Sequence, residues 1–262
     1  ANTIGPGLFL QADYIIENDD LFADTIRKAF DYIEQNDVLL TFGVIPTRPD
    51  TNYGYAQVCG GSEALHSKVP VKVKTFTEKP DRELAKIFLA SGEFFWNAGI
   101  LLWRAETFRK EMEKHMPQVT AYFKGWEHVL GTSVEPEFIT KAFSDCMNIS
   151  LAYGVMEKTE RAWIYPVGFD WQDVGTWESL YNYMAAIRDR IGNAVSAEKT
   201  LTEDTKDTLI ISPEKKKLVA INGLEDFIVV DTDDVLLICP KDDKKFKDFI
   251  SQIAMPEFEK YR

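Results

Sequence analysis

Cysteine and histidine are scarce in this sequence of 262 residues, which contains three of each. The six positions are Cys59, Cys146, Cys239, His66, His115 and His128. No two cysteines form a Cys-x-x-Cys pair, and the histidines lack metal-ligand spacing. Neither a disulfide framework nor a zinc site is therefore expected. The histidines are expected at the surface, and the reducing cytoplasm is the predicted compartment.

Long apolar runs and an excess of positive charge are also missing. No run of about 18 apolar residues occurs, so no transmembrane helix is predicted. The first ten residues lack a basic stretch followed by an apolar core, so no signal peptide is predicted. The 30 Lys and Arg residues are outnumbered by 42 Asp and Glu residues, which gives a net charge of -12. This charge argues against a nucleic acid or an anionic membrane as a partner, since both require a basic surface.

The segments that are present indicate two domains. Apolar runs at 8–10 and 38–45 flank a helical pattern that begins at Asn18, and strand, helix, strand is the unit of a parallel sheet. We expect a three-layer, Rossmann-like α/β domain over 1–191, with a mostly parallel sheet and helices on both faces. After Arg190 short β-type runs recur at about ten-residue spacing, which predicts a small β unit over 192–262. A helix with Phe246, Phe249, Ile250 and Ile253 on one face is expected to close it.

The stretch 169–177 combines an acidic turn with the end of a predicted strand. Asp170 and Asp173 follow the apolar run 162–167 and precede a helical pattern for which Thr176 is the expected N-cap. Ligands of α/β sheets bind where strands end, and a carboxylate there can hold Mg²⁺. Asp13 also follows an apolar segment. The alternative is that these aspartates only stabilise turns, which is common for Asp near Gly.

Six motifs in register resemble one family. They are Gln11-Ala12-Asp13-Tyr14, Asn52-Tyr53-Gly54-Tyr55, Phe76-Thr77-Glu78-Lys79-Pro80, Trp96-Asn97-Ala98-Gly99, Val155-Met156-Glu157-Lys158 and Asp170-Trp171-Gln172-Asp173-Val174-Gly175-Thr176-Trp177. In this order they resemble the bacterial-type mannose-1-phosphate guanylyltransferases, or GDP-mannose pyrophosphorylases. The resemblance covers nearly the whole chain. It implies a nucleotidyltransferase-type α/β domain and a small C-terminal unit like a left-handed β-helix, which helps to form a homodimer.

The resemblance also implies a reaction and its residues. The family makes GDP-mannose and pyrophosphate from GTP and mannose 1-phosphate, and GTP follows here from the family alone. Asp13 and Asp173 would hold Mg²⁺, and Lys79 would meet the sugar phosphate as a catalytic point charge. The substrate-binding residues would be Gly54, Tyr55, Glu78, Lys79, Asn97 and Gly99. Of these, Tyr55 is expected to support its loop, whereas Glu157 is expected to serve packing or a surface pair.

The family's glycine-rich nucleotide-binding segment, Gly-Gly-x-Gly-x-Arg, does not occur in the chain. We expect Ala1 to correspond to a point inside the family's sequence. Two functions stay open: a nucleotidyltransferase, or a sugar-phosphate-binding or regulatory module without nucleotide chemistry. Without the resemblance, Lys79 would be a solvated loop lysine and Asn97 a turn residue.

The sequence also yields a geometric prediction for the aspartate pair. If Asp13 and Asp173 end neighbouring parallel strands, both carboxylates lie at one edge of the sheet. A shared Mg²⁺ would require a separation of about 4–7 Å, and more than about 10 Å would exclude it.

Overall fold

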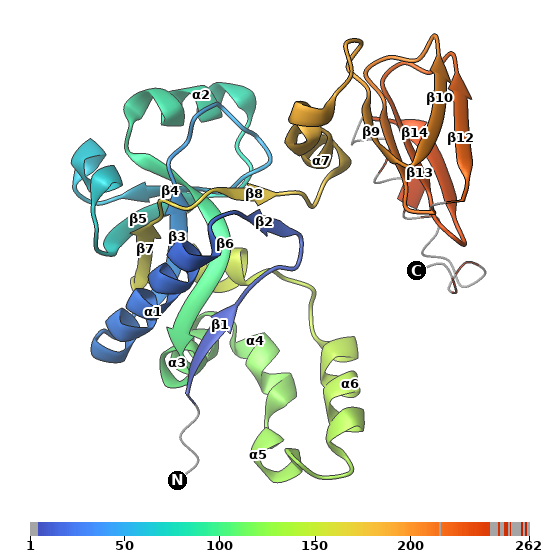
Figure 1. Cartoon of the computed structure of the whole chain (residues 1–262). Coiled ribbons are helices and arrows are strands. Elements are labelled where there is room, and N and C mark those ends of the chain that lie inside the picture. The colour runs from blue at the N-terminus through green and yellow to red at the C-terminus, as the bar shows by residue number, and fades with distance from the viewer. Residues whose placement is uncertain are drawn as a thin grey trace. The chain divides into compact units, whose positions relative to one another are not determined.

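The computed structural model describes residues 5–214 and 216–241, together with 246, 249, 250, 252, 258 and 260. The chain divides into two compact units (Figure 1). Unit 1 comprises Ala1–Ala12 and Ile16–Trp171, and unit 2 comprises Asp13–Ile15 and Gln172–Arg262. No described helix is both long and apolar enough to cross a membrane.

Unit 1 is built on a six-stranded sheet with the order β1-β6-β3-β7-β5-β4. Its strands are β1 (Pro6–Phe9), β3 (Leu39–Val44), β4 (Tyr55–Val58), β5 (Val71–Thr77), β6 (Phe94–Arg104) and β7 (Ala162–Pro166). Among the described strands of this sheet, only β3 and β7 pair in parallel. The long strand β6, green in Figure 1, runs antiparallel to β1, β3 and β4.

The expectation of a mostly parallel sheet is therefore wrong. A buried apolar run has the same composition in parallel and antiparallel pairings, so its pattern could not distinguish them. β1 and β3 do run in the same direction, but β6 lies between them in the sheet.

Helices cover both faces of β3, as the middle layer of an α/β domain requires. Leu39 packs in a cluster with Phe95, Ile164 and Met116, which directly follows α3 (Ala105–His115). The next residue, Leu40, is completely buried and faces the other side, because strand side chains alternate. The first helix, α1 (Asp19–Gln35), contacts β1, β3 and β6.

The remaining helices of unit 1 are shorter. Asp81 caps α2 (Arg82–Ser91) by accepting a hydrogen bond from the amide of Leu84. A helical excursion then runs through α4 (Pro117–Thr120), α5 (Trp126–Val129) and α6 (Glu135–Asp145). A π-helical turn, Ala152–Met156, leads back to β7.

A two-stranded ribbon carries both crossings of the chain between the units. It consists of β2 (Tyr14–Ile16) and β8 (Trp171–Asp173). The helix α7 (Trp177–Tyr183) follows it, and the predicted N-cap Thr176 is confirmed: its hydroxyl accepts a hydrogen bond from the amide of Ser179 in a capping box. This cap fixes the chain direction directly after Asp173.

Unit 2 contains the expected β-helix-like fold. β9 (Ala194–Ala197), β11 (Leu209–Ser212) and β13 (Phe227–Asp231) stack in parallel, as do β10 (Lys199–Glu203) and β12 (Leu218–Asn222). β14 (Leu236–Pro240) closes the stack as an antiparallel strand. Ala194, Leu209 and Ile228 lie in register and are almost completely buried, so successive coils share one apolar column.

Residues 172–191 group with the β-helix unit, although the sequence assigned them to the larger domain. Tyr181 and Met184 join the same apolar cluster as Ala194 and Leu209, which explains the grouping. In the expected closing helix, Phe246, Phe249 and Ile250 are helical, and Ile253 lies outside the described residues.

Candidate active site

Asp13 and Asp173 place their carboxylates around one point in unit 2. A Cβ atom built on Gly175 would lie 3.0 Å from Asp173 Oδ1 and 3.3 Å from Asp13 Cγ, and would overlap Asp13 Oδ2. The distance from Asp13 Cγ to Asp173 Oδ1 therefore cannot exceed the sum of these two distances. The expected closeness of the two carboxylates is confirmed, and it depends on the missing side chain of Gly175.

The reason for this closeness differs from the predicted one. Asp13 precedes β2 and Asp173 ends β8, so the two meet through the β2–β8 ribbon and not at the edge of the main sheet. The Val174 amide donates a 2.9 Å hydrogen bond to the Asp13 carbonyl oxygen, and the Gly175 amide donates one of 2.8 Å to Asp173 Oδ1. Backbone contacts thus hold both residues in place.

Two close carboxylates form a donor set suited to a hard divalent cation. Mg²⁺ usually takes one or two protein carboxylates and completes its coordination with water and substrate phosphates. Within the described part of the chain, no three His, Cys, Asp or Glu side chains form a potential metal site. The pair therefore suits an ion shared with a phosphate ligand better than a closed, all-protein site.

A second group of predicted residues meets within unit 1. A Cβ atom on Gly54 would lie 2.6 Å from Glu78 Oε2 and 3.8 Å from Asn97 Cβ. The Asn97 amide donates a 2.8 Å hydrogen bond to the Gly54 carbonyl oxygen. These three residues come from three different segments, so the sheet assembles a small polar cluster in which a larger residue at 54 would displace Glu78. We call Gly54, Glu78 and Asn97 the sugar cluster, after the substrate-binding role that the family resemblance predicts for them.

Asn97 is held in one orientation by groups behind it. The Thr41 hydroxyl lies 2.6 Å from Asn97 Oδ1 and 3.1 Å from the Ile100 carbonyl oxygen and shares its proton between them, and the Gly99 amide donates a 3.2 Å hydrogen bond to Asn97 Oδ1. Gly99 has a φ of 69°, a backbone conformation that favours glycine. With its oxygen engaged, the Asn97 side chain retains its NH₂ group as the donor for a ligand. Thr41 is completely buried, and no signal in the sequence marked it.

Lys79 follows Glu78 at an exposed position and has an unusual backbone conformation. Its φ is 45°, which is uncommon for any residue with a side chain. It also precedes Pro80, and a residue before proline normally adopts an extended conformation with negative φ. Such conformations persist where the surrounding structure enforces them, and they are concentrated at functional sites.

Tyr55 occupies a supporting position. Its side chain is completely buried, and its hydroxyl accepts a 3.1 Å hydrogen bond from the Asp50 amide and donates one of 2.9 Å to the Asp50 carbonyl oxygen. This closes the loop that leads to Gly54. With the hydroxyl engaged on both sides, Tyr55 shapes the loop and does not offer a group to a ligand.

Glu157 lies at an exposed position, and its carboxyl group is influenced by Glu78 of the sugar cluster. Burial raises its pKa above the ordinary value, the nearby negative charge of Glu78 raises it further, and Lys158 opposes this shift. Glu157 is exposed, as the expected surface position requires, and it is also close enough to the sugar cluster to be coupled to it electrostatically. Its position in the Met-Glu-Lys motif, directly after the π-helical turn, was the available signal.

Comparisons with known families match both parts of the chain. The family described as "Nucleotidyl transferase" matches residues 3–190. The family described as "MannoseP isomerase/GMP-like beta-helix domain" matches residues 199–252. These matches agree with the fold class expected from the sequence.

Individual relatives point in the same direction. The chain is 35% identical to a mannose-1-phosphate guanylyltransferase of Klebsiella pneumoniae, over 97% of this chain and 54% of the relative. It is 34% identical to the alginate biosynthesis protein AlgA of Pseudomonas aeruginosa, over 90% of this chain and 47% of the relative. The chain thus spans about half the length of the curated relatives it matches.

Among solved structures, a mannose-1-phosphate geranyltransferase from Thermus thermophilus is similar with a TM-score of 0.75. The sequence identity is 24%, and the match covers 96% of this chain and 70% of the other. At this identity the similarity shows a shared fold.

Proposed function

Because the chain belongs to the nucleotidyl transferase family, we propose that it takes part in making GDP-mannose and pyrophosphate from GTP and mannose 1-phosphate. The main support is that the chain combines the two carboxylates beside Gly175 with the sugar cluster. The names of relatives such as the guanylyltransferase of Klebsiella pneumoniae support the same substrates. This class of reaction uses small molecules, a nucleotide and a sugar phosphate.

In this proposal the sugar phosphate is held by unit 1. Lys79 places a positive charge against its phosphate, while Asn97 donates to a sugar hydroxyl and Glu78 accepts from another. Gly54 has no side chain, which leaves room for the sugar to approach the backbone. A side chain there would also collide with Glu78 and displace its carboxylate. These contacts would orient one phosphate oxygen for attack.

The chemistry is an in-line displacement at the α-phosphorus of the nucleotide. The phosphate oxygen of mannose 1-phosphate forms the new O–P bond, and the bond to the leaving pyrophosphate breaks. Nucleotidyl transferases generally use a divalent cation, and Asp13 and Asp173 would hold it, with magnesium as the proposed ion. When bound, this ion neutralises phosphate charge. The protein contributes mainly position and electrostatics, as is usual in phosphoryl transfer.

We also propose a homodimer and a cytoplasmic location. The β-helix unit exposes several large apolar side chains on its strands, which are Leu201, Leu218, Leu236 and Ile238. Contact with a second copy would bury them. All three cysteines are free thiols, and one of them is exposed, which suits a reducing compartment.

The alternative is a sugar-phosphate-binding or regulatory module without nucleotide chemistry. It is not favoured, because a module without catalysis has no need of two adjacent carboxylates. The test measures pyrophosphate release from GTP, mannose 1-phosphate and Mg²⁺, with GDP-mannose identified chromatographically. Binding of mannose 1-phosphate without pyrophosphate release, in a protein of the relatives' full length, would overturn the proposal and favour the module.

A further inference from the structure

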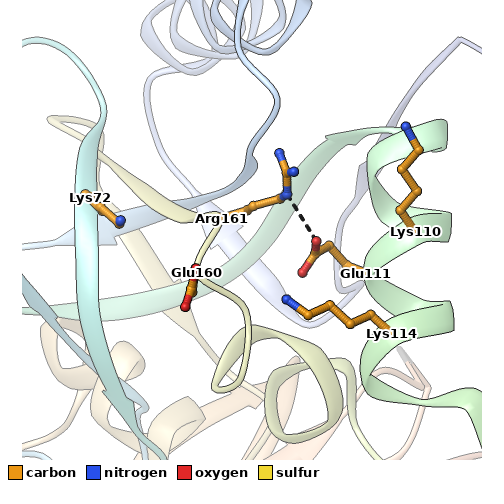
Figure 2. Close-up of a pocket in the computed structure, with 6 residues that line it drawn as sticks. All are labelled: Lys72, Lys110, Glu111, Lys114, Glu160 and Arg161. Carbon is orange, nitrogen blue, oxygen red and sulfur yellow. Dashed lines mark ion pairs between the residues drawn. The ribbon is translucent and has the colours of Figure 1, made fainter.

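A hollow of about 380 Å³ lies in unit 1, away from the sugar cluster. It is lined by Lys72, Lys110, Glu111, Lys114, Glu160 and Arg161 (Figure 2). Four of the six side chains are cationic and two are acidic, so the lining carries two positive charges more than negative ones, in a chain whose net charge is -12. Such a local excess of positive charge requires an explanation, because the rest of the surface is predominantly acidic.

The hollow and the sugar cluster lie at opposite ends of β3. Arg161 directly precedes β7, and its carbonyl oxygen accepts a 2.9 Å hydrogen bond from the amide of Leu39 at the start of β3. Asn97 pairs with Gly43 near the other end of the same strand. Four residues along a strand span about 13 Å, so a small ligand in one place does not reach the other.

The carboxylate of Glu111 is engaged by neighbouring groups, which weakens its repulsion of an anion in the hollow. Its Oε1 lies 3.1 Å from Arg161 Nε, and its Oε2 lies 3.2 Å from His115 Nε2. The Thr159 hydroxyl donates a 2.6 Å hydrogen bond to Oε2. His115, expected at the surface, instead packs against this nearly buried carboxylate, so that expectation is wrong.

Two lysines remain available to a ligand. Lys72 on β5 and Lys114 on α3 reach toward the hollow from opposite sides (Figure 2). Within the described part of the chain, neither ammonium group has an ion-pair partner, whereas Lys110 pairs with Glu106 at 2.7 Å. Glu160 adds one acceptor between them, which suits a hydroxyl donor on the same ligand.

We propose that this hollow is a second binding site, which takes a small metabolite carrying phosphate groups. Lys72 and Lys114 would bind its phosphate oxygens from two sides, and Glu160 would accept a hydrogen bond from a hydroxyl group. The volume fits a compact ligand, and small-molecule sites begin at about 300 Å³. The acidic surface disfavours an extended polyanion such as nucleic acid. This site is independent of the proposed reaction.

The test is calorimetric titration of the metal-free chain with inorganic tripolyphosphate. The double variant K72Q/K114Q removes the two available charges, and K86Q/K28Q removes two surface lysine charges elsewhere and serves as the matched control. A third variant, K79Q, reports binding at the sugar-phosphate position. We expect K72Q/K114Q to bind about tenfold more weakly or worse, and K86Q/K28Q to bind within about twofold of wild type.

The opposite results would overturn the inference. If wild type does not bind tripolyphosphate, or if K72Q/K114Q binds as tightly as its matched control, the hollow is not a phosphate site. If only K79Q weakens binding, the probe binds at the sugar-phosphate position. Thermal unfolding of each variant, expected to match wild type because these lysines are exposed, shows that the fold is retained.

Discussion

Replacing Gly175 by alanine should weaken metal binding while leaving the fold intact. The new methyl group would overlap Asp13 Oδ2 and would lie 3.0 Å from Asp173 Oδ1, which is tighter than most real Cβ contacts. The Asp13 carboxylate is exposed and can rotate away. It would have to move by roughly 0.5 Å or more, since close-packed atoms do not overlap.

The magnitude follows from the tolerance of metal coordination. Ligand distances hold to within about 0.2 Å, so a displacement of this size removes one of two carboxylates from the coordination shell. We expect the dissociation constant for Mn²⁺, which takes the same oxygen ligands as Mg²⁺, to rise by about tenfold or more. The free energy of unfolding should change by less than about 1 kcal/mol, because a surface carboxylate moves and no core atom does.

The assay is an electron paramagnetic resonance titration with Mn²⁺, combined with urea unfolding. Gly168→Ala is the matched control, because a Cβ atom there meets no atom within 4 Å and neither glycine has a positive φ. The control should bind Mn²⁺ like wild type. Equal Mn²⁺ affinity in Gly175→Ala and wild type would refute the assignment of Asp13 and Asp173 as the metal pair.

Three further substitutions test other parts of the site. Asp173→Asn should lower the rate of pyrophosphate release far more than it lowers the free energy of unfolding, because it removes a metal ligand and relieves repulsion between carboxylates; equal losses in both would contradict this. Thr41→Val should raise the KM for mannose 1-phosphate by freeing Asn97, with a loss of about 1–2 kcal/mol in stability, and an unchanged KM would show that the hydroxyl does not orient the amide. Glu157→Gln should be more stable than wild type near neutral pH, because the raised pKa of Glu157 means that its charged form destabilises the folded state above that pKa. This advantage should shrink as the pH falls through the raised pKa toward the ordinary glutamate value, and a difference that does not vary with pH in denaturant titrations would contradict it.

Local signals in the sequence predicted local structure well. Thr176 was identified as an N-cap because cap chemistry depends on residues three positions apart. The closeness of Asp13 and Asp173 was also expected, although the pattern of apolar runs attributed it to the wrong pair of strands. The short strands with regular turns predicted a small β unit after Arg190, and its β-helix-like form was implied by the family resemblance.

Features that depend on distant contacts could not be predicted. Thr41 meets Asn97 across 56 positions in sequence, and nothing in the residues around Thr41 indicates this hydrogen bond. The antiparallel course of β6 depends on which strands it joins, and its apolar composition is the same for either direction. The grouping of Tyr181 with the β-helix depends on tertiary packing. The sequence placed the domain boundary after Arg190, where a polar stretch begins, and so assigned Tyr181 to the other domain.

The β2–β8 ribbon also constrains the order in which the chain can fold. Pairing its strands from the unfolded chain would close a loop of about 160 residues, at an entropic cost of roughly 4–5 kcal/mol for only three residues in each strand. Once β1 and β7 are in the six-stranded sheet, only the short segments 10–13 and 167–170 remain to be ordered. The Asp13–Asp173 pair should therefore form late, and its stability should be coupled to that of the sheet in unit 1. Substitutions that loosen β1 or β7, which lie outside the pair of aspartates, should weaken cation binding before they unfold the β-helix.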